Sequence, residues 1–189
     1  MTTDPRPARS RTALIHAITD VLAQQTPDAV NITDIVKAAG VSRPTFYQHF
    51  ADTTALTRAA ALEKLTATFA AVDAQNLTPD AEGFTGRFTT ALLTELRDDA
   101  TFYRNVLKTA GDSALISELI GFLSDRLLNH SPFAAGVHSK TTEHESYAEF
   151  IAAGMSWSAM RWLCTDFTEN NAPEAMAERL TAMVRAAAY

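Results

Sequence analysis

Residues 33–50, which read TDIVKAAGVSRPTFYQHF, constrain the fold of this chain more than any other segment. The apolar residues Ile35 and Val36 begin a pattern with helical spacing, which predicts a short helix. Gly40 then supplies the left-handed backbone conformation at which helices commonly end. Ser42 follows as a natural N-cap for a second helix. The segment therefore predicts two short helices joined by a tight glycine turn.

The second of these helices has two chemically distinct faces. Pro44 fits its first turn, where the missing N–H costs nothing. Phe46 and Phe50 are four residues apart and form an apolar inner face. The side chains left for the outer face are mostly hydrogen-bond donors: Arg43, Thr45, Tyr47, Gln48 and His49. A donor-rich helix set across a glycine turn is typical of a helix-turn-helix that enters a DNA major groove.

The same residues resemble the N-terminal domain of the TetR family of transcriptional regulators. The resemblance covers a helix over residues 11–25, the stretch DIVKAAGVS from Asp34, the block TFYQHF from Thr45, and the ADTTAL that follows. It implies an all-α fold with about nine helices. These would form an N-terminal three-helix helix-turn-helix domain and a larger C-terminal helical bundle.

This family organisation divides the chain into four regions. We expect a flexible basic arm over 1–10, the helix-turn-helix domain over 11–52, a connecting helix over 53–75, and a ligand-binding and dimerisation domain over 76–189. The boundary is placed at NLTPDAEG, residues 76–83, which is rich in turn-forming residues. The segment from His130 to Lys140 is expected to be a loop. Thr142, with Glu145 three residues later, predicts a capping box that opens the next long helix.

The resemblance also assigns roles in DNA binding. Arg43, Thr45 and Gln48 would face base edges, since Arg suits guanine, Gln suits adenine and the Thr methyl suits thymine. Tyr47 and His49 resemble family positions that contact phosphates. The full predicted DNA-binding set is Thr33, Ser42, Arg43, Pro44, Thr45, Tyr47, Gln48, His49 and Thr53. In one departure, Thr53 and Thr54 follow Asp52 where the family often has lysine, so a charged phosphate contact is lost. The alternative is that these residues form only a solvated helix face.

Net charge is divided unevenly along the chain. The whole chain carries −6, yet residues 1–58 hold six basic and five acidic side chains. The acidic excess therefore lies in the C-terminal part. A net charge of +1 over residues 1–58 attracts DNA only weakly, so DNA affinity should depend on where individual hydrogen-bond donors lie. The arginines of the arm, Arg6, Arg9 and Arg11, could reach a minor groove or form an ordinary basic terminus.

The C-terminal part is expected to dimerise through its last two long helices. Small residues between Ala148 and Ala159 would allow close helix approach, either between two copies or inside one monomer. An apolar small-molecule effector is expected in this domain. The aromatic residues predicted to line its pocket are Phe88, Phe102, Phe122 and Trp157, which could instead be ordinary core residues.

No catalytic, cofactor or metal motif is visible. The set His130, His138 and His144 with Glu143, Glu145 and Glu149 matches no known ligand spacing. Cys164 is the only cysteine and is expected to be buried. The N-terminus lacks an apolar stretch of signal-peptide length. We therefore expect a cytoplasmic protein that is not an enzyme and that needs no cofactor or metal.

The sequence thus predicts a homodimeric TetR-like repressor. It would bind a near-palindromic double-stranded operator, and a mostly apolar ligand would release it. Two alternatives stay open: a regulator of the same fold without a ligand, and a helical protein-interaction module without specific DNA binding.

Overall fold

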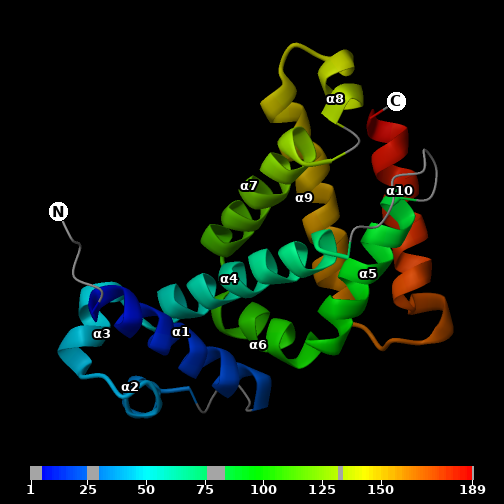
Figure 1. Cartoon of the computed structure of the whole chain (residues 1–189). Coiled ribbons are helices and arrows are strands. Elements are labelled where there is room, and N and C mark those ends of the chain that lie inside the picture. Colours follow the sequence, from blue (N-terminus) through cyan, green and yellow to red (C-terminus); the bar gives the residue numbers. More distant parts are fainter. Residues whose placement is uncertain (1–5, 25–29, 76–83, 132–133, 189) are drawn as a thin grey trace. The chain divides into compact units, whose positions relative to one another are not determined.

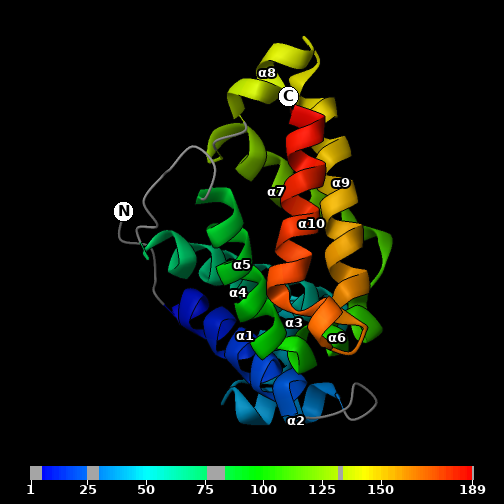
Figure 2. The ribbon, with the colours of Figure 1, turned by 90° about the vertical axis from the view of Figure 1, so that its right-hand side faces the viewer.

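The computed structural model describes residues 6–24, 30–75, 84–131 and 134–188. Within these ranges the protein is all-α, as predicted, with one short 3-10 helix and no strand (Figures 1 and 2). The helices are α1 (Arg6–Gln24), α2 (Ile32–Ala38), α3 (Arg43–His49), α4 (Thr53–Asp73), α5 (Phe84–Asp98), α6 (Ala100–Ala110), α7 (Ser113–Asn129), α8 (Ala134–Lys140), α9 (His144–Leu163), η2 (Glu169–Asn171) and α10 (Pro173–Ala188). None of these described helices combines the length and the apolar character needed to cross a membrane.

The chain folds into two compact units. Unit 1 comprises Met1–Thr66 with Asp99–Asp112, and unit 2 comprises Ala67–Asp98 with Ser113–Tyr189. Helix α6 therefore belongs with the N-terminal helices, whereas the sequence prediction placed all of 76–189 in one C-terminal domain. The predicted boundary at 76–83 lies outside the described residues.

The core of unit 1 forms around α1. Leu14, Ile18 and Leu22 follow one another at intervals of four residues and are all fully buried. Ile35 of α2 and Phe46 of α3 are also fully buried, as their positions in the sequence pattern predicted. A single apolar stripe on α1 thus fixes the two short helices that follow it.

Helix α1 begins earlier than predicted. It starts at Arg6, so the second half of the predicted flexible arm is helical. Arg11 lies on this helix, where its guanidinium stands 3.5 Å from the Glu63 carboxylate and 5.7 Å from the centre of the Phe50 ring. The arginine is therefore positioned by α4 and by the end of α3.

Helix α6 is tied to the end of α1 by a buried amide. Asn105 Nδ2 donates a hydrogen bond of 2.8 Å to the Leu22 carbonyl oxygen, and Asn105 is 6% exposed. The last four carbonyls of a helix have no partner inside it, so such a side chain acts as a C-terminal cap supplied from elsewhere in the chain. This contact joins residues 83 positions apart.

Helix α4 is continuous from unit 1 into unit 2. Asp52 caps its start, because Asp52 Oδ1 accepts a hydrogen bond of 2.7 Å from the Ala55 amide. Within unit 1, the Arg58 guanidinium lies 2.9 Å from the Asp112 carboxylate, and the Lys64 ammonium lies 2.7 Å from the Asp99 carboxylate. These two ion pairs connect the N-terminal part of α4 to both ends of α6.

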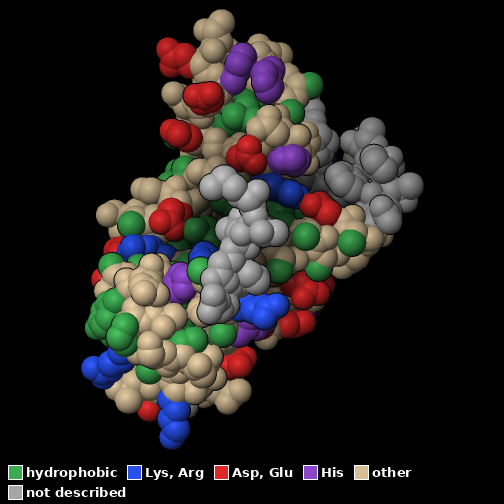
Figure 3. Space-filling model, turned by 60° about the vertical axis from the view of Figure 1, so that its left-hand side comes forward, with side chains coloured by type: hydrophobic (Ala, Val, Ile, Leu, Met, Phe, Trp, Pro, Cys, Tyr) green, Lys and Arg blue, Asp and Glu red, His purple; other side chains and the backbone are tan. Residues whose placement is uncertain are grey.

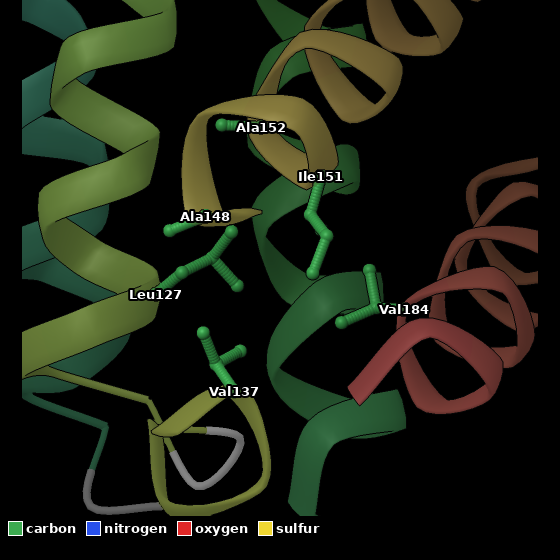
Figure 4. Packing of buried hydrophobic residues seen from close by; sticks show 6 residues of the cluster. All are labelled: Leu127, Val137, Ala148, Ile151, Ala152 and Val184. Carbon is green, nitrogen blue, oxygen red and sulfur yellow. The ribbon is translucent and has the colours of Figure 1, made fainter. Parts of the chain in front are cut away.

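The core of unit 2 includes an apolar cluster shared by four helices. Leu127 of α7, Val137 of α8, Ala148 of α9 and Val184 of α10 are buried in it (Figure 4). Ala148 and Ala152 are fully buried against this cluster, and Ser156 one turn further on is also buried. Ala148 and Ala152 of α9 therefore serve packing inside the monomer.

Three local predictions are wrong. Part of the loop expected between His130 and Lys140 forms α8, which raises the number of described α-helices to ten. The capping box at Thr142 does not form, because α9 starts at His144 and its N-cap, Glu143, makes no side-chain cap bond. Cys164 is exposed because it is the C-cap residue, just beyond the last packed turn of α9.

Candidate nucleic-acid interface

The turn between α2 and α3 has the geometry that its sequence predicts. Gly40 adopts φ +64°, the left-handed conformation that favours glycine. The Gly40 amide donates to the Lys37 carbonyl at 3.2 Å, and the Val41 amide donates to the Val36 carbonyl at 3.0 Å. This pair of bonds is the Schellman arrangement for ending a helix. The turn therefore fixes where α3 starts relative to α2.

Both short helices carry side-chain caps. Asn31 Oδ1 accepts a hydrogen bond of 3.0 Å from the Asp34 amide at the start of α2. Ser42 Oγ accepts one of 3.2 Å from the Thr45 amide at the start of α3, and the two hydroxyls of Ser42 and Thr45 lie 2.8 Å apart. These caps satisfy amides that would otherwise lack a partner within so short a helix.

The two faces of α3 separate as expected. Phe46 is fully buried and Phe50 is 7% exposed, and their ring centres lie 6.2 Å apart. Tyr47 is 56% exposed, and its ring meets the Phe46 ring edge-on at 5.3 Å. Arg43 and Gln48 are exposed as well. The buried rings hold the helix in place while the donor-bearing side chains face solvent.

One side-chain contact links the two helices across the turn. Arg43 Nη2 donates a hydrogen bond of 2.7 Å to Thr33 Oγ1. A guanidinium has five N–H donors, so most of them stay available to a ligand. The contact holds the Arg43 side chain against the start of α2.

The predicted DNA-binding residues all lie in this part of unit 1, and they differ in exposure. Those that are exposed are Thr33, Ser42, Arg43, Pro44, Tyr47 and Gln48, and those that are half-buried are Thr45, His49 and Thr53. Thr53 begins α4, directly after the Asp52 cap. The structure thus places these predicted DNA-binding residues at the starts of α2, α3 and α4 and along α3. Their role in DNA binding stays a prediction.

The predicted pocket residues do not form one group. Phe88 and Phe122 both contact Phe69 in unit 2, at ring-centre distances of 5.9 Å and 5.2 Å. Phe102 lies in unit 1, where it is buried beside Tyr103 and beneath the Lys64 ammonium. Trp157 is 60% exposed on α9. Only two of the four residues therefore share a cluster.

Trp157 belongs to an exposed apolar surface that the sequence did not reveal. Phe150, two helical turns before it, is 73% exposed, and Met183 on α10 is 61% exposed. Trp157 and Met183 line a groove of about 350 Å³, with Arg161 and Arg179 among its polar residues. We call Phe150, Trp157 and Met183 the α9–α10 surface. In the sequence, the spacing of seven residues between Phe150 and Trp157 could have indicated this surface, since it puts both side chains on one side of a helix.

This fold, with a capped helix-turn-helix presented on a helical scaffold, defines the class of DNA-binding transcriptional regulators. A family model for bacterial regulatory proteins of the TetR family matches residues 14–60, and one for a transcriptional regulator C-terminal region matches residues 86–186. The chain belongs to the TetR family.

Solved structures show the same fold at low sequence identity. The TetR family repressor AlkX from Dietzia sp. strain DQ12-45-1b is 18% identical with a TM-score of 0.67, over 95% of this chain and 97% of that one. The fatty acid degradation regulator FadR from Bacillus halodurans is 15% identical with a TM-score of 0.58, over 97% and 96%. The dihydroxyacetone kinase operon activator DhaS is 16% identical with a TM-score of 0.55, over 94% of each chain. No curated protein sequence matches the chain significantly.

Proposed function

We propose that this protein is a homodimeric repressor that binds a near-palindromic operator through α3. The observation that carries the proposal is the division of α3 into a buried aromatic face and an exposed face with Arg43, Tyr47 and Gln48. Arg43, Thr45 and Gln48 read base edges, and Tyr47 and His49 hold phosphates. Thr33, Ser42, Pro44 and Thr53 flank this face and border the DNA backbone.

Dimerisation follows from the small size of α3. A helix of seven residues reaches few base edges, whereas two such helices one turn of DNA apart read two half-sites. The α9–α10 surface supports a dimer through the last two long helices, because large apolar side chains exposed on neighbouring helices indicate an interaction site. Phe150 and Trp157 are the members of this surface on α9.

We propose that the effector is a mostly apolar small molecule bound in unit 2, beside Phe88 and Phe122. Two buried hydroxyls of the same unit, on Ser156 and Thr181, have no hydrogen-bond partner among the described residues. Such groups are suited to receive a polar atom of a ligand.

Helix α4 connects the proposed effector site to DNA binding. Its C-terminal part carries Phe69 at the aromatic cluster, and the Arg126 guanidinium lies 4.8 Å above this ring and 2.7 Å from the Asp73 carboxylate. Its N-terminal part carries Arg58 and Lys64, which bond to the ends of α6. An effector that favours a different position of α4 would therefore lower operator affinity by a population shift.

The test is selection of binding sites from random duplex DNA at near-physiological salt, with wild type and Tyr47→Ala in parallel. The proposal predicts a two-fold symmetric site that wild type enriches and the variant does not. Enrichment of no sequence by wild type would favour a protein-interaction module. The selected site then serves to screen apolar compounds for operator release, and a regulator without a ligand would be released by none of them.

A further inference from the structure

The side-chain rings of two histidines, His138 and His144, contact each other in unit 2. His138 is near the end of α8 and His144 is the first residue of α9. Their ring centres are 4.5 Å apart and the ring planes are tilted by 38°. The two histidines are six positions apart, on either side of the turn between α8 and α9, and this spacing matches no metal-binding motif. The fold, and not a local motif, therefore brings the two imidazole rings together.

One hydrogen bond fixes the tautomer of neutral His138. Its Nδ1 lies 2.6 Å from the Ala134 carbonyl oxygen. A carbonyl can only accept, so Nδ1 carries the proton and donates, and Nε2 keeps a free lone pair. Histidines that bind metals commonly have this arrangement, in which the second nitrogen donates to a backbone carbonyl and orients the ring.

The second ring contains a nitrogen without a partner. His144 Nδ1 is shielded from solvent and has no hydrogen-bond partner among the residues that the structure describes. Buried polar atoms are nearly always bonded, so this nitrogen is suited to bind a water molecule, an ion or a ligand. It lies on the ring that faces His138.

The separation of the rings fits a shared metal ion. Two imidazoles bound to one tetrahedral ion at about 2.0–2.1 Å have ring centres roughly 5 Å apart. The observed 4.5 Å is about half an ångström shorter, so the rings would have to move slightly apart to hold an ion between their nitrogens.

The surroundings also favour a cation. Glu143 and Glu145 flank His144 in the sequence and are exposed, and Lys140 is the one basic residue in the sequence between the two histidines. In the view of Figure 3, histidine side chains (purple) lie against one another near acidic side chains (red). The described residues contain no group of three or more His, Cys, Asp or Glu placed to share an ion. Water would therefore complete the coordination.

We propose that His138 and His144 form an open, exchangeable site for a divalent transition-metal ion that prefers imidazole, such as Zn²⁺, Ni²⁺ or Cu²⁺. The site lies outside the α3 surface and goes beyond the proposed regulatory function. An ion held there bridges α8 and α9 next to the point where Val137 enters the core with Ala148 (Figure 4). Because the bridge exists only in the folded protein, binding stabilises unit 2.

The experiment is calorimetric titration of the tag-free full chain with Zn²⁺ and with Cu²⁺, alongside thermal unfolding. We expect one ion per chain, and a rise in Tm of roughly 5–10 °C at one hundred times Kd. His138→Ala and His144→Ala should each weaken binding at least tenfold. His130→Ala is the matched control, because His130 stands 3.8 Å from the Asp125 carboxylate in the same unit and should leave the affinity unchanged.

Two results would overturn the proposal. Equal affinity in wild type and in His138→Ala would mean an adventitious ion only, and a loss confined to His130→Ala would place the ion elsewhere. His138 is exposed, so its replacement tests the site even if the His144 variant does not fold. Circular dichroism of the metal-free variants verifies their folding.

Discussion

The Arg43 guanidinium donates a 2.7 Å hydrogen bond to the Thr33 hydroxyl, which joins the first residue of α3 to the first turn of α2. If α3 binds DNA as proposed, we expect Thr33 to affect binding through Arg43 as well as through its own hydroxyl. Arg43→Ala should cost about 1–3 kcal/mol on the selected operator and relax the base preference at one position. Thr33→Val should cost less, about 0.5–1.5 kcal/mol, and keep the preference. Fluorescence anisotropy with single-base operator variants measures both. Unchanged base preference in Arg43→Ala would show that another side chain reads that base.

Tyr47→Phe should weaken binding to all DNA sequences by a similar factor. The change removes a hydroxyl expected on a charged phosphate, worth about 1.5–3 kcal/mol, and keeps the ring contact with Phe46. The matched control is Tyr147→Phe in unit 2, where the hydroxyl donates to the Ala187 carbonyl at 2.6 Å. The control should lower stability slightly and leave operator affinity intact. Equal affinity of Tyr47→Phe and wild type would remove Tyr47 from the interface.

Gly40→Ala should destabilise the protein by about 1–2 kcal/mol, because alanine is strained at φ +64°. Gly121→Ala is the control, since this glycine is exposed within α7 and an added Cβ would meet no atom within 4 Å. It should stabilise by about 0.5–1 kcal/mol. Chemical denaturation measures both variants. If both substitutions changed the free energy of unfolding in the same direction, the left-handed turn would not be a determinant of stability.

Asn105→Ala should destabilise unit 1 by about 1–3 kcal/mol, because the Leu22 carbonyl loses its partner. Asn129→Ala removes a surface contact with Asp125 on α7 and should change stability by less than about 0.5 kcal/mol. Hydrogen exchange at the C-terminal turn of α1 provides the local measurement. Unchanged protection there in Asn105→Ala would show that α6 does not hold the end of α1.

Trp157→Glu should convert the proposed dimer to a monomer, because it places a charge within the α9–α10 surface. Glu149→Gln is the control, since this exposed residue of α9 lies outside that surface as we define it. Sedimentation velocity at micromolar concentration separates the two states. A Trp157→Glu protein that still sediments as a dimer would place the interface on other helices.

The parts of the fold that local rules determine were predictable. Gly40, Ser42 and Phe46 each satisfy a requirement set within four residues of the chain, so the turn, the cap and the buried face of α3 follow from sequence alone. The assignment of α3 to DNA binding rests on the same residues. Helical spacing also predicted the buried stripe of α1, although not its start at Arg6.

The parts that depend on long-range contacts were not predictable. Whether an aromatic residue such as Trp157 packs inward depends on which helix face finds a neighbour, and periodicity alone does not specify this. Asn105 became a cap because the fold brings α6 to the end of α1. His138 and His144 gained their contact through α8, a helix in a segment expected to be a loop.

Hydroxyl-radical footprinting of wild type on the selected operator tests the central claim most directly. Two copies of α3 presented by a dimer should protect two stretches on one face of the duplex, related by a two-fold axis and centred about 34 Å or a multiple of it apart. Tyr47→Ala at the same concentration should leave the DNA unprotected. A single protected stretch without symmetry, or protection that persists in the variant, would contradict a dimeric operator-binding protein that uses α3.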